Sequence, residues 1–302
     1  MKPILVTGAA GRQGSTGRHT VLKLLARGLP VRAMVRQEDD RSWELERQGA
    51  EIVIADYFDF DSLKKALHGV SDAYFCYPIA AGVTEAAGLF AEAGKAEELR
   101  RVVTLSLGSA SPTAASPQAK ALFVAERIFE WAGFDSVNLR ILGFFMENIL
   151  MMDAPLIKAR DQIANSFGAA DLAWIAGEDV GNVAASLLAD PSRWGERTLS
   201  LVGPIRLNYP QLARAMTDVL GRQIDYRELT PNEWHEALTK ALSARGQENA
   251  RGADHLVAQS VALKARVLPA PDDLFQAITG DSPTSFSQFV IQHRDRFTPT
   301  DV

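Results

Sequence analysis

Short apolar runs alternate with longer amphipathic or alanine-rich segments through the first half of the chain. Such runs predict strands buried on both faces, and the segments between them predict helices that cover a parallel sheet. The predicted strands span residues 4–6, 31–36, 51–57, 72–78, 101–107 and 136–142. A helix is predicted after the first strand, and others over residues 42–49, 62–70 (capped by Asp61 or Ser62), 83–99 and 120–132. This alternation is typical of a doubly wound α/β fold with a parallel sheet.

The second half follows a less regular pattern. A short strand and then a helix capped by Glu178 or Asp179 are predicted over residues 171–190, another strand over 197–203, and mostly helices beyond. We therefore expect a sheet domain over residues 1–152, with 173–204 returning to it, and a smaller, mainly helical lobe over 205–302 with 153–172. In doubly wound folds the ligand lies outside the carboxyl ends of the strands, so the cleft between the two domains is the expected substrate site.

Three glycines follow the first predicted strand at a spacing of three residues: Gly8, Gly11 and Gly14. A strand, a glycine turn and a helix N-terminus together present outward N–H groups and partial positive charge to a pyrophosphate. The spacing is G-x-x-G-x-x-G rather than G-x-G-x-x-G. This is the form found in short-chain dehydrogenase-like Rossmann domains. We therefore expect a dinucleotide site in a Rossmann-type sheet, with a bare turn as the alternative.

The side chain at the end of the second predicted strand selects the dinucleotide. An acidic residue there binds the ribose 2′-hydroxyl, whereas an arginine pairs with a 2′-phosphate. The chain has Arg36 at this position. The arginine favours NADP(H) over NAD(H), although Glu38, Asp39 and Asp40 add negative charge nearby and a solvated surface arginine is the alternative.

Further cofactor contacts are expected from the glycine loop and from the ends of the next two strands. Asp56 closes the third strand beside Tyr57, and it either bounds the adenine pocket or begins a turn. Tyr77 ends the fourth strand and is expected to run alongside the central part of the dinucleotide. The contacts expected from the loop are those of Ala10, Arg12 and Gln13. Arg12 is either a second phosphate partner or a solvated side chain.

The usual catalyst of short-chain dehydrogenases is missing. These enzymes use a tyrosine acid whose pKa is lowered by a lysine four residues later, but none of the five tyrosines has a lysine there. Lys120 stands where the lysine of this motif belongs, and Ser116 takes the place of the tyrosine. Ser106 and Ser109 lie near the usual orienting serine, with ordinary loop serines as the alternative. Lys120 is the catalytic candidate, and both Ser106 and Lys120 are expected to contact the cofactor.

Composition argues against several other classes of protein. The formal net charge is −5 and no basic block stands out, which argues against a nucleic-acid partner. No apolar stretch reaches the length of a membrane span, and the N-terminus carries no basic-then-apolar signal. The five histidines lack metal-ligand spacing, and Cys76, the single cysteine, is expected to be a buried, inert thiol. We expect a cytoplasmic, metal-free protein.

With these features the chain resembles the NmrA-like family, atypical members of the short-chain dehydrogenase superfamily, along nearly its whole length. Ile141 departs from the family, which often has proline after the preceding arginine. The resemblance implies a Rossmann domain with a small C-terminal lobe and a preference for NADP(H). The segments that carry it are TGAAGRQG (7–14), VRAMVR (31–36), Lys120…Glu126…Arg140 followed by GFFMENIL (143–150), GEDVG (177–181) and ITGDSPTSFSQFV (278–290).

The resemblance also implies site residues and two functional classes. Lys120 would face the nicotinamide ribose, with Phe144, Phe145 and Asn148 lining the pocket near the nicotinamide, although core packing explains the two phenylalanines equally well. Some relatives reduce quinones or similar small acceptors with NADPH; others bind the dinucleotide without turnover and report redox state to a protein partner. A quinone tolerates the missing tyrosine acid better than a simple ketone does. We therefore favour a reductase of a small-molecule acceptor over a sensor, and the oligomeric state is left open.

Overall fold

The computed structural model describes residues 2–11, 14–190, 195–243, 250–265 and 268–299. The chain forms two compact units. Unit 1 contains Met1–Ile141, Gly177–Leu201 and Asp273–Ser282, and unit 2 contains Leu142–Ala176, Val202–Asp272 and Pro283–Val302. This division differs from the boundaries expected from the sequence chiefly in two segments, because residues 142–152 lie in unit 2 and residues 273–282 in unit 1.

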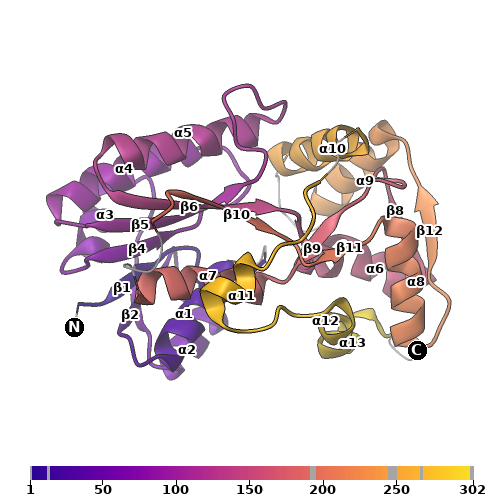
Figure 1. Ribbon diagram of the computed structural model, residues 1–302, viewed down its shortest axis with the longest axis horizontal. Coiled ribbons are helices and arrows are strands. Elements are labelled where there is room, and N and C mark those ends of the chain that lie inside the picture. The colour runs from indigo at the N-terminus through magenta and orange to yellow at the C-terminus, as the bar shows by residue number, and fades with distance from the viewer. Residues whose placement is uncertain (1, 12–13, 191–194, 244–249, 266–267, 300–302) are drawn as a thin grey trace. The chain divides into compact units, whose positions relative to one another are not determined.

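Unit 1 is built on a seven-stranded sheet with the order β10-β6-β5-β4-β1-β2-β3 (Figure 1). Neighbouring strands from β3 through β1 to β6 are parallel. The strand order reverses between β1 and β4, which is the topological switch point where ligands bind in such sheets. The predicted Rossmann-type fold is confirmed. The strands are β1 (Ile4–Val6), β2 (Val31–Val35), β3 (Glu51–Ile54), β4 (Asp72–Phe75), β5 (Arg101–Leu107), β6 (Asp135–Leu142) and β10 (Thr198–Val202).

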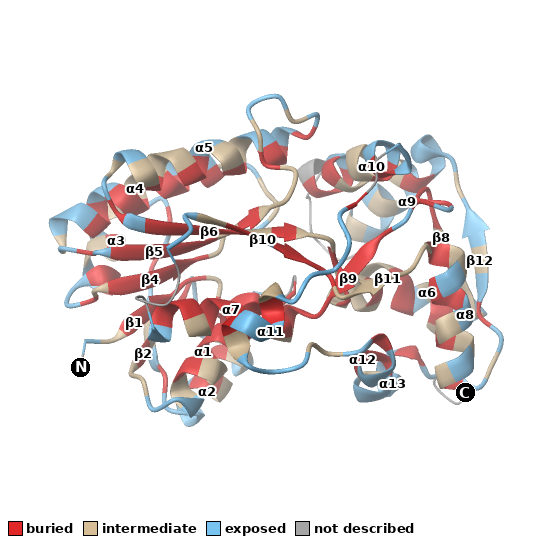
Figure 2. Ribbon diagram, viewed as in Figure 1, coloured by how far each residue is buried: buried red, intermediate tan, exposed pale blue. Residues whose placement is uncertain are grey.

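Helices cover both faces of this sheet. One face carries α3 (Phe60–Leu67), α4 (Val83–Ala96) and α5 (Pro117–Trp131), and the other carries α1 (Thr16–Ala26), α2 (Asp40–Arg47) and α7 (Gly177–Ala189) (Figure 1). On the first face, the rings of Phe75, Phe90 and Phe129 contact one another with centroids 5.0–6.1 Å apart. The central strands are therefore buried on both sides (Figure 2), which explains their continuous apolar runs.

Residues 273–282 belong to unit 1, to which a short helix and side-chain hydrogen bonds attach them. The helix α11 (Leu274–Thr279) packs on α7. Just beyond it, Asp281 accepts a hydrogen bond from Asn182 of α7 (2.8 Å), and Arg27 donates to the same asparagine (3.0 Å). The Thr-Gly-Asp tail segment is thereby tied to α1 and α7.

Three helix starts differ from the expectation. The cap of α3 is Asp59, which accepts from the backbone N–H groups of residues 61 and 62, so the prediction of Asp61 or Ser62 is wrong. Glu178 and Asp179 lie inside the first turn of α7, which begins at Gly177, so the prediction that either caps this helix is also wrong. The helix α5 begins at Pro117, three residues before the predicted start, because Ser116 caps it.

Unit 2 contains small sheets as well as helices. β7 (Phe144–Phe145) pairs in parallel with β9 (Ala173–Ile175), which pairs antiparallel with β11 (Ile205–Arg206). A second, parallel pair joins β8 (Gln162–Asn165) to β12 (Asp225–Glu228). The helical elements are the π-helix η1 (Ile149–Asp153), α6 (Ala154–Arg160), α8 (Tyr209–Leu220), α9 (Pro231–Ser243), α10 (Ala250–Lys264), α12 (Phe286–Gln292) and α13 (Arg294–Phe297). Throughout the described parts of both units, every helix falls short of the length and apolarity needed to cross a bilayer.

Candidate functional site

The glycine loop between β1 and α1 requires its glycines. Gly8 and Gly14 have positive φ angles of 65° and 61°, which side chains rarely adopt. A Cβ atom at Gly8 would lie 3.1 Å from the carbonyl oxygen of Cys76 at the end of β4. At Gly11 it would lie 2.9 Å from the oxygen of Gly8, which already accepts the Gly11 N–H. The loop therefore keeps its tight path beside the switch point.

Two further glycines hold the helices against this loop, and reading the N-terminal triplet alone missed both. A Cβ atom at Gly17, in α1, would lie 2.5 Å from the oxygen of Gly8. A Cβ atom at Gly177, the first residue of α7, would lie 1.5 Å from the oxygen of Gly14. Gly181, one turn later, faces His19 in the same way. The four-residue spacing of the two α7 glycines was the available signal, because it places both on one helix face.

The N-terminus of α1 is suited to bind an anion. Its N-cap residue, Ser15, is in the left-handed region, and the Ser15 side chain makes no capping hydrogen bond. The first turn of α1 carries no acidic residue. The partial positive charge of this helix end is therefore not compensated by its own side chains. Arg12 and Gln13, predicted to contact the dinucleotide, lie outside the described residues.

Basic side chains gather near the end of β2. Arg36 is exposed there, and its positive charge acts on the nearby Tyr57 phenol. Arg41, in α2, donates to the backbone oxygen of Ala10 in the glycine loop and pairs with Asp39. The Arg41 hydrogen bonds hold the pKa of the Asp39 carboxyl below its usual range, so the negative charge of Asp39 is locally neutralised. The sequence-based prediction missed Arg41, because its partner Ala10 is 31 residues away in sequence and no local pattern shows the contact.

The residues predicted to contact the cofactor after the third and fourth strands already have structural partners. Asp56 is exposed, and its carboxylate accepts from the backbone N–H of Phe58 (2.9 Å), as expected for a residue that begins a turn. The Tyr57 hydroxyl donates to the oxygen of Cys76 (2.8 Å), and burial raises the pKa of Tyr57 well above its usual range. The Tyr77 hydroxyl donates to the oxygen of Ala81 (2.7 Å), and the Tyr57 and Tyr77 rings meet edge to face at 5.2 Å.

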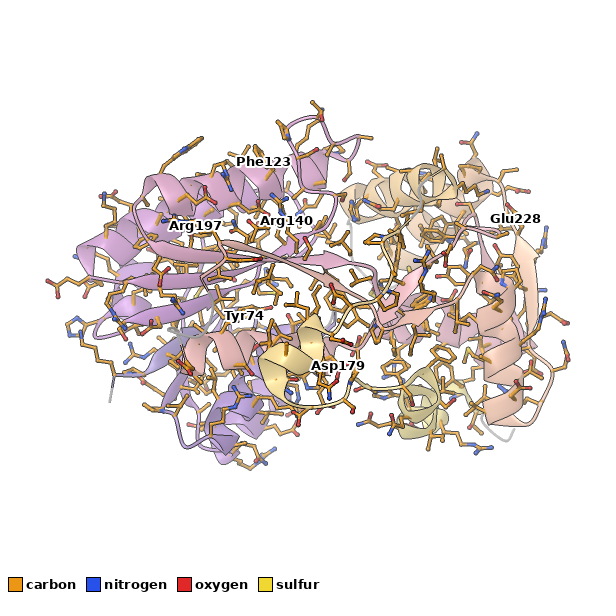
Figure 3. The ribbon with its side chains drawn as sticks, viewed as in Figure 1. Tyr74, Phe123, Arg140, Asp179, Arg197 and Glu228 are labelled. Atoms are coloured by element: carbon orange, nitrogen blue, oxygen red, sulfur yellow. The ribbon has the colours of Figure 1, made fainter. Side chains whose placement is uncertain are left out.

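Cys76 lies against the glycine loop and is partly buried, not fully buried as expected. Its Sγ is 3.7 Å from Thr16 Oγ1, which also accepts from the hydroxyl of Tyr74 (3.0 Å), a residue labelled in Figure 3. Burial raises the pKa of Cys76 to about 11. A thiol with this pKa is mostly neutral at pH 7 and is a poor nucleophile.

A buried ion pair stands at the carboxyl ends of β5 and β6. Glu126 of α5 is fully buried. It accepts from the Ser106 hydroxyl (2.5 Å) and from Arg140 Nε (2.9 Å), the arginine labelled in Figure 3. Ser106 and Arg140 are direct neighbours across the two strands. Glu126 raises the pKa of Arg140 further. The Ser106 hydroxyl, a predicted cofactor contact, thus donates to the carboxylate of Glu126 inside unit 1.

Lys120 is exposed in the first turns of α5, and its backbone N–H donates to the oxygen of Ser116 (3.1 Å). Ser116, which stands in the place of the usual tyrosine, is buried and accepts from the backbone N–H of Ala119 (3.4 Å) as the cap of α5. The lysine therefore presents a cation on the surface of unit 1, and the serine has a structural role.

The three predicted pocket residues belong to unit 2. Phe144 is buried, and its ring contacts Phe167 (5.0 Å) and Trp174 (5.9 Å), which favours core packing for this residue. Phe145 and Asn148 are partly exposed. Asn148 is the N-cap residue of η1, but its side chain makes no capping hydrogen bond. The described residues contain no group of three or more His, Cys, Asp or Glu side chains suited to hold a metal.

Comparison with known proteins identifies a matching family and several similar proteins. The model of the NmrA-like family matches residues 1–270. An NAD(P)H azoreductase of Xenophilus azovorans is 25% identical over 295 residues, which cover 97% of this chain and 99% of the relative. The NADPH-dependent quinone oxidoreductase of Escherichia coli, solved with NADPH, has a TM-score of 0.78 at 22% identity, covering 97% and 99% of the two chains. NmrA, a negative transcriptional regulator solved with NADP, has a TM-score of 0.73 at 16% identity, covering 97% and 96%.

Proposed function

Because the chain belongs to the NmrA-like family, we propose that it is an NADPH-dependent reductase of quinone-like or other small electrophilic acceptors. The observation that carries the proposal is the glycine loop. Its glycines have no side chains, and the N-terminus of α1 that follows has no side-chain cap, so together they form a cradle for a pyrophosphate. The azoreductase and the quinone oxidoreductase support the reaction class. NADPH, when bound, would supply the hydride.

The chain's own residues bind and orient the dinucleotide in this proposal. The loop of Gly8 and Gly11 holds the pyrophosphate, Arg36 pairs with the 2′-phosphate, and Arg41 keeps the loop in place through Ala10. Lys120 holds the nicotinamide ribose. No tyrosine acid accompanies Lys120, so the proton taken up by the reduced acceptor comes from solvent. A quinone suits this arrangement because its reduction depends chiefly on proximity and orientation.

The proposal is tested by titrating the protein with NADPH, NADH and NADP⁺ in a calorimeter and then screening acceptors with the dinucleotide that binds best. We expect tightest binding of the phosphorylated dinucleotides and oxidation of NADPH in the presence of a quinone. Binding without turnover across a broad panel of quinones, azo dyes, aldehydes and enones would overturn the reductase.

Replacing Arg36 by alanine is expected to raise the Kd for NADPH by about 10- to 100-fold and to leave the Kd for NADH within about twofold. The reason is that a charge-assisted hydrogen bond to phosphate contributes roughly 1.5–3 kcal/mol, and NADH has no 2′-phosphate. Calorimetry measures both constants. Arg47→Ala removes another exposed arginine from unit 1 and serves as the control. Equal losses for the two dinucleotides would contradict the role of Arg36.

Replacing Lys120 by alanine is expected to lower kcat/KM for the acceptor by about tenfold or more, since a lost charge-assisted hydrogen bond of at least ~1.4 kcal/mol changes a rate by that factor. Lys95→Ala, which removes an exposed lysine of α4, is the matched control. Stopped-flow measurement of NADPH oxidation with saturating cofactor gives the rate. A Lys120→Ala rate equal to that of the control rules out this role.

A non-catalytic sensor of the NADP(H) redox state is the second candidate. The missing tyrosine acid favours it, as does the fold likeness to a transcriptional regulator solved with NADP. A sensor must bind the oxidised and reduced dinucleotides with different affinity, because a ligand shifts a state only by its differential binding. Equal Kd values for NADP⁺ and NADPH would exclude it.

A further inference from the structure

Besides Asp161 and Arg222, whose atoms form an ion pair with each other (3.1 Å), unit 2 has three buried polar atoms without a hydrogen-bond partner among the described residues. They are Oδ2 of Asp153, Nδ2 of Asn165 and the hydroxyl of Tyr209. The three residues come from η1, β8 and α8 and are at most 4% exposed. Buried polar groups are nearly always paired, so three orphans in one unit need an explanation.

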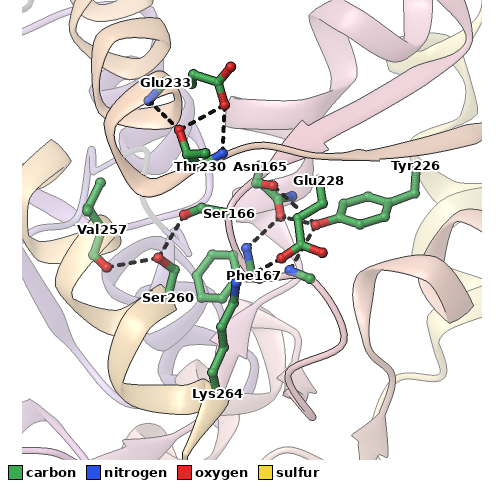
Figure 4. A network of polar contacts seen from close by, with 11 residues as sticks. Asn165, Ser166, Phe167, Tyr226, Glu228, Thr230, Glu233, Val257, Ser260 and Lys264 are labelled. Carbon is green, nitrogen blue, oxygen red and sulfur yellow. Dashed lines mark hydrogen bonds and ion pairs between the residues drawn. The ribbon is translucent and has the colours of Figure 1, made fainter.

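The orphaned atoms belong to one cluster in an aromatic core. The side-chain oxygen of Asn165 accepts from the backbone N–H of Phe167 (3.1 Å) and lies 3.1 Å from the Tyr226 hydroxyl (Figure 4). The Tyr209 ring stacks between Phe167 (5.4 Å) and Tyr226 (5.9 Å). The Asn165 amide acts on the Asp153 carboxyl, which in turn acts on both tyrosines. A donor, an acid and a hydroxyl therefore interact within this buried cluster.

Asp153 is also the last residue of the π-helix η1, and this places the cluster directly after a predicted pocket segment. Asn148 immediately precedes η1 and Phe145 ends β7 just before it, and both are partly exposed. π-helical turns are rare and occur frequently at functional sites. The same five-residue segment therefore joins the buried Asp153 to the partly exposed Asn148.

We propose that Asp153, Asn165 and Tyr209 form a polar anchor that positions Phe145 and Asn148 for the acceptor, and that the anchor holds only while Asp153 carries its proton. The inference rests on the proposed reductase function in assigning Phe145 and Asn148 to an acceptor. A protonated Asp153 is a hydrogen-bond donor and acceptor that matches the Asn165 amide and the Tyr209 hydroxyl. An ionised Asp153 would be a buried charge without an ion-pair partner among the described residues, which is energetically costly.

The surroundings of Asp153 set its proton affinity. Burial raises the pKa of Asp153 to about 8, against a smaller opposing effect of the Asn165 amide. From α8 and β12 the facing titratable groups are Tyr209 and Tyr226, and burial raises the pKa of both, to about 12 for Tyr226. Charged residues of α6, and of α13 which packs on α6, do not offset the effect of burial on the Asp153 pKa. These residues are Lys158, Arg160, Arg294, Asp295 and Arg296. Asp153 therefore ionises first in this cluster.

The expected pH dependence of stability follows from these values. The pKa of Asp153 is about 8 in the folded state and about 3.9 in the unfolded chain. Between these values only the folded state binds the proton, so the unfolding equilibrium constant rises by up to tenfold per pH unit and levels off above pH 8. Asp153→Asn removes this dependence. We expect the stability of the variant to exceed that of the wild type progressively from pH 5 to pH 8 in urea unfolding.

Enzyme kinetics separate an anchor from a merely buried acid. With 1,4-benzoquinone and saturating NADPH, we expect the wild-type KM for the quinone to rise at least fivefold from pH 7 to pH 9, with a smaller change in kcat. Asp153→Asn keeps the side-chain shape without the charge, so its KM should match the wild type at pH 7 and stay constant. Asp153→Ala should show a raised KM at both pH values. Asp218→Asn removes an exposed carboxylate of α8 and is the control.

The two proposals fail in different ways. A wild-type KM that stays constant, or one that rises equally in Asp153→Asn, overturns the anchor and leaves the reductase intact. If no acceptor is reduced, the reductase is lost, and urea unfolding followed by the emission of Trp174 and Trp234 decides the anchor. These tryptophans contact Tyr209 and Phe167 (5.6 and 5.2 Å). Identical unfolding profiles of the wild type and Asp153→Asn from pH 5 to pH 9 would then overturn it.

Discussion

Replacing Gly177 by alanine is expected to reduce the free energy of unfolding by about 3 kcal/mol and to abolish measurable NADPH binding. The added Cβ atom would lie 1.5 Å from the backbone oxygen of Gly14. Because this oxygen belongs to the backbone, it cannot rotate out of the way as a flexible side chain could. Either α7 or the glycine loop must move, and overpacking of this kind costs roughly 1–3 kcal/mol and occasionally more. Since Gly14 ends the proposed pyrophosphate cradle, a shift of the loop also removes the binding geometry.

Urea unfolding and calorimetric titration with NADPH measure the two effects. Gly88→Ala is the matched control, because Gly88 lies within α4 and a Cβ atom there meets nothing within 4 Å. That variant should gain roughly 0.5–1 kcal/mol from helix propensity and keep the wild-type Kd. Wild-type stability and affinity in Gly177→Ala would show that the loop accommodates the methyl group.

The contrast between Gly177 and Gly8 explains how far the sequence predicts this site. Gly8 is recognised because its strand, turn and helix are adjacent in the chain, so a local pattern contains the whole reason for it. The reason for Gly177 is an oxygen of Gly14, far away in sequence. The four-residue spacing of the α7 glycines indicates a helix face without side chains, but it does not show what that face contacts. The contact of Arg41 with Ala10 is hidden for the same reason. The glycine loop was predictable, whereas the partners of the residues that hold it in place were not.

The strands also differ in how far the sequence predicts them. The central strands of unit 1, such as β1 and β4, are largely apolar because helices bury both faces, and all seven strands of this sheet were predicted near their observed positions. β12 has the sequence DYRE and is largely exposed, so its sequence is like that of a surface loop. Its strand character comes from pairing with β8, which begins at Gln162, opposite Asp225. Asp153 follows an apolar run, and an acid in such a run was the available signal for a buried carboxyl.

Replacing Glu126 by alanine is the second change for which we expect a large effect, a loss of about 3–5 kcal/mol in the free energy of unfolding. Glu126 is fully buried and holds both Arg140 and Ser106. Removing one partner of a buried ion pair leaves the other charge uncompensated, which is far more costly than breaking a surface pair. Arg140 is 21% exposed at its side chain, so solvent relieves part of this cost and the lower half of the range is expected.

Two further variants separate charge from shape at this position. Glu126→Gln keeps a side-chain oxygen for Ser106 and should cost less than the alanine variant. Glu51→Ala removes the exposed partner of Arg32, whose half-buried side chain retains the backbone oxygens of Ala66 and His68, and should cost at most about 1 kcal/mol. If Glu126→Ala costs no more than Glu51→Ala in urea unfolding, the buried pair does not hold α5 to the sheet. If its cost is large while Glu126→Gln folds normally but binds NADPH more weakly, the carboxylate also sets the position of Ser106 for the dinucleotide.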